Sequence, residues 1–98
     1  MEQSSAFAED WHAVENTSLC VDYDSEKYDA NGVAWTYKTC GSDYLSQTKV
    51  DCAHQSAGLV WYVYDDSRGW IAHSSMTNTP EYEMVGEECD TWASLHHN

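Results

Sequence analysis

Apolar and polar residues alternate over short stretches of the chain, which is the pattern of strands with one buried face. The clearest case is segment 33–38, where Val33, Trp35 and Tyr37 fall on one side and smaller or polar residues on the other. The pair Asn31-Gly32 stands directly before it and is a strong turn signal. The pattern therefore predicts a half-buried strand that follows a tight turn.

A second region predicts a β-hairpin. The apolar run 59–64 breaks at the polar stretch 65–69 and resumes at 70–73, as two strands joined by a tight turn would. Weaker alternation predicts two further strands, at 19–23 and 48–52. Tyr82, Met84 and Val85 form a possible last strand, which is followed by a polar tail with Cys89 and Trp92. We therefore expect an all-β fold, a small barrel or sandwich of about five to six antiparallel strands.

The length of 98 residues fits one domain. We divide it into a polar N-terminal arm at 1–18, a single β domain at 19–92 and a tail at 93–98. Residues 1–9 lack the basic stretch and the apolar run of a signal peptide or membrane span. We therefore expect a mature chain from which a leader has been removed.

The amino-acid composition supports the predicted strands and excludes some classes of partner. Five Trp and seven Tyr carry much of the apolar content, while Leu is scarce. Acidic residues number 17 against 4 basic ones, for a net charge of -13, so phosphate-rich surfaces repel the chain. We exclude DNA, RNA and anionic membranes as partners. The charge itself serves either solubility or a basic partner, and the sequence leaves both readings open.

The four cysteines favour two disulfides. They are even in number and contain no Cys-x-x-Cys pair, which speaks against a zinc ribbon or a redox motif and for a secreted or periplasmic protein. The alternative is that they are small buried apolar residues of a cytosolic protein. Two pairings compete: the favoured one joins Cys40 to Cys52 and Cys20 to Cys89, and the other joins Cys20 to Cys40 and Cys52 to Cys89.

Alternating acidic residues raise the question of a calcium site. Asp22, Asp24 and Glu26 alternate, but Lys27 occupies the place of the EF-hand glycine and Val33 that of its final glutamate. A looser calcium site and a solvated acidic loop remain as readings, and the loop is favoured. We expect no metal and no cofactor.

Catalytic chemistry has little support in the sequence. Of the five histidines, only His73 stands beside a predicted strand, next to Ser74 and Ser75. Adjacent His and Ser residues are more often a surface feature than a catalytic pair, and a core this small leaves little room for a dry pocket. We expect a protein that is not an enzyme.

A series of motifs runs from Gly32 to Met76. It consists of the alternating strand Val33, Trp35, Tyr37, the strand Thr48-Lys49-Val50, and the closing pattern Trp61-Tyr62-Val63, Gly69-Trp70-Ile71, Ser74-Ser75-Met76. This series, a little under half the chain, resembles the bacterial SH3-like domains of secreted and cell-wall-associated proteins. The chain departs from that family after the first strand, where Lys38, Thr39 and Cys40 stand in place of an Arg-x-x-Pro motif.

The resemblance implies a non-catalytic module that binds a protein, a peptide or a cell-wall peptide through aromatic residues. Carried over to this chain, the binding residues would be Trp70, Tyr44, Trp35, Tyr37 and Trp61. Trp and Tyr bury a large area at low rotamer cost, which suits binding, but the same rings can form the core. We expect the core for Trp35, Trp61 and Tyr37, which leaves Trp70 and Tyr44 as the surface candidates.

Two functions follow from these features. The first is the binding module with an aromatic face, and the alternative is an acidic inhibitor or immunity-type protein that blocks a basic toxin or hydrolase. The placement of six acidic residues separates them, since an inhibitor would gather these residues on one face around an exposed aromatic ring. They are Asp22, Asp24, Glu26, Asp29, Asp65 and Asp66.

Overall fold

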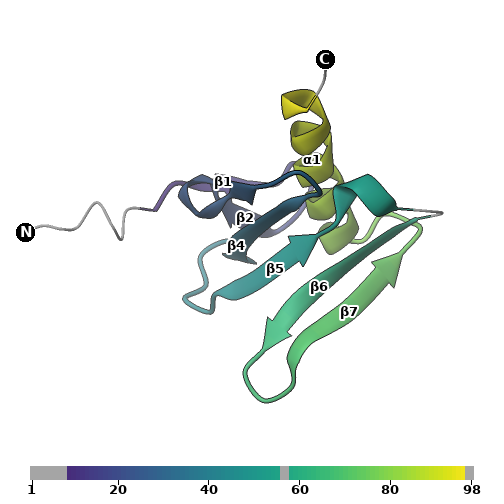
Figure 1. Cartoon of the computed structure of the whole chain (residues 1–98). Coiled ribbons are helices and arrows are strands. Elements are labelled where there is room, and N and C mark those ends of the chain that lie inside the picture. Colours follow the sequence, from purple (N-terminus) through teal and green to yellow (C-terminus); the bar gives the residue numbers. More distant parts are fainter. Residues whose placement is uncertain (1–8, 56–57, 97–98) are drawn as a thin grey trace, which may run out of the picture.

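The computed structural model describes residues 9–55 and 58–96 and shows a curved antiparallel sheet with one helix (Figure 1). The strands are β1 (Trp11–Ala13), β2 (Leu19–Asp22), β3 (Lys27–Tyr28), β4 (Val33–Thr39), β5 (Ser46–Val50), β6 (Leu59–Asp65) and β7 (Gly69–Ser75), and the helix is α1 (Pro80–Leu95). Two single 3-10 turns, η2 (Tyr23–Ser25) and η3 (Cys52–His54), follow β2 and β5. The predicted all-β class with two disulfides is confirmed, in a fold that is mostly antiparallel sheet with one C-terminal helix.

The strands form one antiparallel path in the order β1-β2-β4-β5-β6-β7, and the short β3 pairs with β4. The five strand candidates before residue 74 all lie in this sheet, and the hairpin of β6 and β7 has the predicted turn. At that turn Asp65 Oδ1 accepts hydrogen bonds from the backbone N–H groups of Ser67 and Arg68. Strand β1 falls within the segment assigned to the N-terminal arm, and α1 continues into the assigned tail.

The predicted last strand is wrong, because Tyr82, Met84 and Val85 belong to α1. Thr79 caps this helix by accepting a hydrogen bond at its hydroxyl from the Tyr82 backbone N–H, and Pro80 occupies the first turn. Met84, Val85 and Glu88 are the buried residues of α1. This spacing fits one face of a helix, and the short alternation at 82–85 fits a helix as well as a strand.

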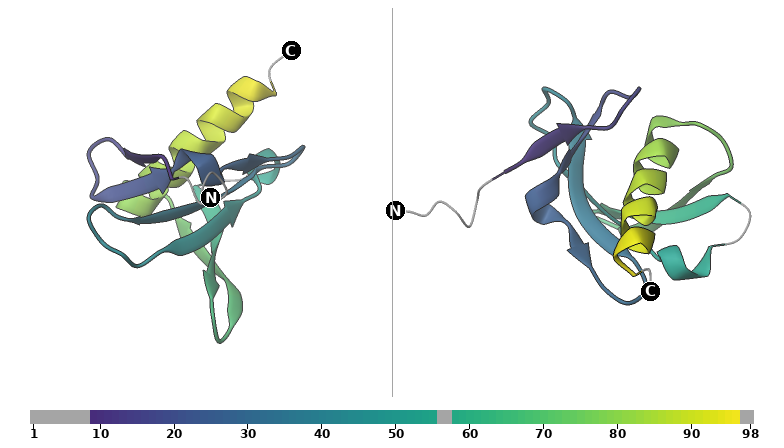
Figure 2. Two further views of the ribbon diagram at one scale, coloured as in Figure 1. Left: turned by 90° about the vertical axis from the view of Figure 1, so that its left-hand side faces the viewer. Right: turned by 90° about the horizontal axis from the view of Figure 1, so that it is seen from above.

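Helix α1 lies across the concave side of the sheet, so that the strands curve around it (Figure 2). Met84 and Val85 are fully buried there, and the Trp35 indole N–H donates a hydrogen bond to the Met84 sulfur at 3.3 Å. The helix closes the core that the sheet alone would leave open. The core residues are Val14, Leu19, Val21, Val33, Trp35, Val50, Trp61, Met84 and Val85.

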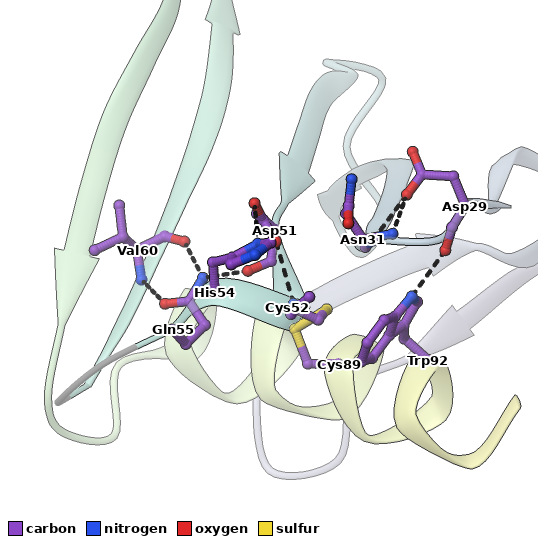
Figure 3. Close-up of polar contacts among 11 residues, drawn as sticks. Asp29, Asn31, Asp51, Cys52, His54, Gln55, Val60, Cys89 and Trp92 are labelled. Atoms are coloured by element: carbon purple, nitrogen blue, oxygen red, sulfur yellow. Dashed lines mark hydrogen bonds and ion pairs between the residues drawn. A yellow bond between two sulfur atoms is a disulfide. The ribbon is translucent and has the colours of Figure 1, made fainter. Parts of the chain in front are cut away.

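The disulfides join Cys20 to Cys40 and Cys52 to Cys89, so the favoured pairing was wrong and the alternative is present. Strands β2 and β4 are neighbours, and this pairing brings Cys20 close to Cys40. The helix, which was not expected, brings Cys89 to η3 (Figure 3). The indole N–H of Trp92 donates a hydrogen bond to the Asp29 carbonyl at 2.9 Å. This bond holds α1 at a second point, three residues after Cys89.

The start of β6 is held by a side chain from the preceding loop. The Gln55 amide N–H group donates to the carbonyls of Asp51 and Val60, and its oxygen accepts from the Val60 N–H (Figure 3). These bonds join the end of β5 to the start of β6, so the projecting hairpin has a fixed origin on the sheet.

Candidate binding face on the outer side of the sheet

The outer side of the sheet, opposite α1, carries side chains that the core does not use. Strand alternation sends Val33, Trp35 and Trp61 inward and their neighbours outward. One outward row crosses four strands, in which Lys49 pairs with Ala34 on one side and Tyr62 on the other, and Tyr62 pairs with Ala72. The side chains of this row are small at its two ends, where Ala34 and Ala72 stand, and large at its centre, where Lys49 and Tyr62 stand.

Three aromatic residues are exposed on this side. Tyr62, Tyr64 and Trp70 keep 38 %, 44 % and 40 % of their surface in solvent. Tyr64 and Trp70 oppose each other across the hairpin and meet edge to face, with ring centroids 5.3 Å apart. The Lys49 ammonium lies 4.2 Å from the centre of the Trp70 ring, which is a cation–π contact.

The charges of the outer side differ from those of the whole chain. Lys27 pairs with outward Ala34, Lys38 lies 4.4 Å over the Trp11 ring, and Lys49 stands at the centre, so all three lysines are on this side. The outward positions of β4 to β7, all within the described part of the chain, hold no carboxylate. We call the set Lys27, Lys38, Lys49, Tyr62, Tyr64 and Trp70 the aromatic–lysine face.

Shallow hollows run across this face. One is lined by Lys27, Lys49 and Tyr62 together with the carboxyls of Asp29 and Asp51, and the next by Lys27, Thr36 and Trp70. A third shares Thr36 with the second and reaches Tyr44, Tyr64 and the carboxyls of Asp65 and Asp66. Because neighbouring hollows share lining residues, they form one track that an extended ligand could follow.

The aromatic residues singled out in the sequence divide between the core and this track. Trp35 and Trp61 are buried at 3 % exposure, and Tyr37 is half-buried and packs against the core. Trp70 and Tyr44 line the track, in adjoining hollows. Sequence reasoning missed Tyr62, Tyr64 and Lys49. The signal was available for the tyrosines, since strict alternation from buried Trp61 places both on the opposite side of β6.

The six acidic residues lie at three places in the fold, and three of them, Asp29, Asp65 and Asp66, line hollows of the track. Asp22, Asp24 and Glu26 surround η2, where Asp22 caps the turn by accepting from the Asp24 N–H. Asp29 lies in the turn before β4, and Asp65 and Asp66 lie at the tip of the hairpin. The structure places these residues at three separate positions.

Local hydrogen bonds lower the pKa of two of these carboxyls. Asp29 accepts from the backbone N–H groups of Asn31 and Gly32, which lowers its pKa. Hydrogen bonds from the Ser67 hydroxyl and backbone, joined by those from Arg68, lower the pKa of Asp65 to about 2. Both carboxylates therefore serve the turns in which they stand.

His73 and Ser74 do not form a pair. His73 lies opposite Trp61 and stacks on its ring at 6.2 Å, whereas Ser74 lies opposite outward Val60. Adjacent strand residues point to opposite faces, so the imidazole and the hydroxyl are on different sides of the sheet. Within residues 9–55 and 58–96, no group of three or more His, Cys, Asp or Glu side chains is placed to hold a metal ion.

The two disulfides indicate an oxidising compartment. Of the helices in the described residues, none has the length and apolar character needed to cross a membrane. No family model matches the chain, and no curated protein or solved structure matches it either.

Proposed function

We propose that this protein is a secreted or periplasmic, non-catalytic module that binds a peptide segment of a protein partner through the aromatic–lysine face. The observation that carries the proposal is the exposed group of Tyr62, Tyr64 and Trp70 around Lys49. Rings of this size bury large areas on binding at low conformational cost, and they are enriched among the residues that dominate binding energy.

The lysines of the aromatic–lysine face predict a ligand that carries carboxylates. The three lysines attract acidic groups, while the aspartates that line the two outer hollows of the track, Asp29, Asp51, Asp65 and Asp66, repel them. Carboxylates of a ligand would therefore lie at the lysines and not beside these aspartates. The track from Lys49 past Trp70 to Tyr44 suits an extended chain with apolar residues between the acidic ones.

The resemblance to bacterial SH3-like domains supports the same type of ligand. In that family an aromatic surface receives peptides, including the peptides of the cell wall, and Trp70 is the residue that the resemblance and the exposed face share. Membership of the family stays a prediction. The inhibitor alternative has weaker support, because only three of its six acidic residues, Asp29, Asp65 and Asp66, line the track, while the other three surround η2.

A selection from a random peptide display library tests the proposal. We expect selected peptides to be rich in Asp, Glu and large apolar residues, and to bind Trp70→Ala and Lys49→Gln more weakly than the unchanged protein. Tyr23→Ala and Arg68→Gln are the matched controls, since Tyr23 is an exposed aromatic residue beside the helix and Arg68 a cation in the hairpin turn. Both controls should bind normally.

Sedimentation with purified peptidoglycan identifies the source of the peptide. Retention on peptidoglycan that Trp70→Ala abolishes would assign a cell-wall peptide, and selected linear peptides without such retention would assign a protein segment. Selection of basic peptides, or of peptides that bind Trp70→Ala and Lys49→Gln unchanged, would refute the proposal.

A further inference from the structure

A second cavity lies on the helix side of the sheet, away from the aromatic–lysine face. It has a volume of about 160 Å³ and lies between β1, β2, η2 and α1. Its lining combines the apolar side chains of Val14, Val21 and Met84 with three carboxyl groups, from Glu26, Glu87 and Glu88. His12, Ala13, Tyr23, Tyr28 and Thr91 complete the lining.

Glu88 is the unusual residue of this cavity. Only 5 % of it is exposed, and its Oε1 atom has no hydrogen-bond partner among the described residues. The Glu26 carboxyl adjoins it in the cavity lining. Burial, with the adjoining Glu26, raises the pKa of Glu88 well above its usual range. A buried carboxyl oxygen without a partner is costly, and two adjoining carboxyls repel each other once both are ionised, so the pair calls for a positive group.

The walls suit a positive charge. Tyr23 stacks on His12 with ring centroids 3.9 Å apart, and both rings border the cavity with the ring of Tyr28. Burial is the largest cause that raises the pKa of Tyr23, and the negative charges of Glu26, Glu88 and Glu87 raise it further. These charges make the electrostatic potential beside the Tyr23 ring negative. Aromatic rings and carboxylates together are the surroundings in which organic cations bind.

Carboxylates next to the cavity extend this potential over the surface. Burial raises the pKa of Glu87, and the carboxylates of Glu15, Glu83 and Asp90 raise it further. Glu83, Glu87 and Asp90 line a neighbouring hollow along α1, and the negative field of such groups draws cations toward this part of the surface. The cavity therefore combines carboxylates, aromatic rings and the buried carboxyl of Glu88 in one lining.

We propose that this cavity binds a primary ammonium or guanidinium group at the end of an alkyl stem. The cation would lie against Glu88 and Glu26, where its N–H groups donate to the carboxyl oxygens, and the stem would pass between Tyr23 and the apolar side chains of the lining. No three side chains in the described residues are arranged as metal ligands, so an organic cation fits the cavity better than a metal ion. This site is separate from the aromatic–lysine face and does not depend on it.

Binding of such a cation is coupled to a proton. The neutral Glu88 carboxyl loses its proton to solvent as the cation enters, and the resulting carboxylate pairs with the bound charge. Affinity should accordingly rise with pH as long as the ligand stays protonated. The heat of binding should depend on the ionisation enthalpy of the buffer, because the buffer takes up the released proton.

Titration of the full chain with n-butylammonium, n-butylguanidinium and neutral 1-butanol, by NMR and calorimetry, tests this site. We expect saturable shifts at Thr91, His12 and Tyr23 with the two cations and none with the alcohol. Glu88→Gln, which keeps the shape of the side chain, should weaken cation binding by about tenfold or more. The matched control Glu81→Gln removes a charge from the first turn of α1, outside both the cavity lining and the hollow of Glu83, Glu87 and Asp90, and should change the affinity little.

A free lysine-containing peptide, compared with the diamine putrescine, identifies the source of the cation. Binding of the peptide assigns a basic side chain of a partner, and binding of putrescine alone assigns a small amine. Unchanged affinity in both Glu88→Gln and Glu26→Gln, each confirmed as folded by its melting transition, would overturn the proposal. Absence of saturable binding by all the cations would overturn it as well.

Discussion

The ammonium of Lys49 lies 4.2 Å from the centre of the Trp70 ring, on the side of the sheet that α1 does not cover. The two residues come from strands that are not neighbours, β5 and β7, with Tyr62 and Tyr64 on the strand between them. The sheet register therefore assembles a cation and three rings from positions far apart in the sequence. Nothing in the core requires these side chains, and this is why we assign them to binding.

Replacement of the two tryptophans on opposite sides of the sheet should separate binding from folding. Trp61→Ala should lower the free energy of unfolding by about 3–5 kcal/mol, because it leaves a cavity in the core. Trp70→Ala should lower it by less than about 1 kcal/mol, as expected for an exposed contact. Urea denaturation followed by circular dichroism measures both values. Similar losses in the two variants would show that Trp70 serves the fold.

The two disulfides should differ modestly in their contribution to stability. Cys52 and Cys89 are separated by 37 positions and Cys20 and Cys40 by 20, and a longer loop restricts the unfolded chain more. Paired serine substitutions at Cys52 and Cys89 should lower the free energy of unfolding by about 4 kcal/mol, against about 3 kcal/mol at Cys20 and Cys40. Thermal melts of the two double variants test this order. The reverse order would mean that α1 is held mainly by Met84 and Val85.

Glu88 should make the protein less stable as the pH rises. A carboxyl whose pKa is higher in the folded chain than in the unfolded one keeps its proton longer when folded, so stability falls from about pH 4.5 up to the raised value. The groups that face Glu88 are Glu26 after η2, Glu87 on α1, Tyr23, Tyr28, and His12 on β1.

Subtracting the pH profile of Glu88→Gln from that of the unchanged protein isolates this effect. The difference should grow steadily as the pH rises from about 4.5, the ordinary value of the carboxyl. Asp29 and Asp65 do not interfere, because their lowered pKa values act only below their ordinary value of 3.8. A difference that is constant with pH would show that folding leaves the pKa of Glu88 unchanged.

Asp65 should hold the tip of the hairpin and lose this role only in strong acid. Its pKa of about 2 means that its contribution to stability is present above pH 3.8 and disappears as the pH falls through 2. NMR titration of the carboxyl should find the midpoint near 2. Asp65→Asn should loosen the turn at Ser67 and Arg68 and speed amide exchange there, while exchange in β4 stays unchanged. An ordinary midpoint near 3.8 would contradict the role.

Strand alternation predicted most of the sheet, because a half-buried strand shows its inner face directly in its sequence. Val33 and Trp35 on β4 and the hairpin of β6 and β7 are examples. The helix was missed because 82–85 is too short to separate the two periods, although Thr79-Pro80 offered a cap signal. Its buried face includes Glu88, and a buried carboxyl interrupts the apolar pattern by which a helix is recognised.

The sites could be predicted only in part. Trp70 and Tyr44 were found as exposed aromatic candidates, but Lys49 joins them only through the pairing of β5 with β6 and β6 with β7. Strand order and register depend on contacts across the fold, which a single sequence does not show. The disulfide pairing and the cavity at Glu88 depend in the same way on where α1 packs.

The dissociation constant of a selected acidic peptide, measured by calorimetry for the unchanged protein and for Trp70→Ala, tests the binding face most directly. We predict a constant about tenfold or more higher for Trp70→Ala, and a measurable affinity of the unchanged protein at ~0.5 M salt, because salt screens the lysines but not the buried rings. Equal constants for the two proteins would contradict the assignment of this face as the binding site.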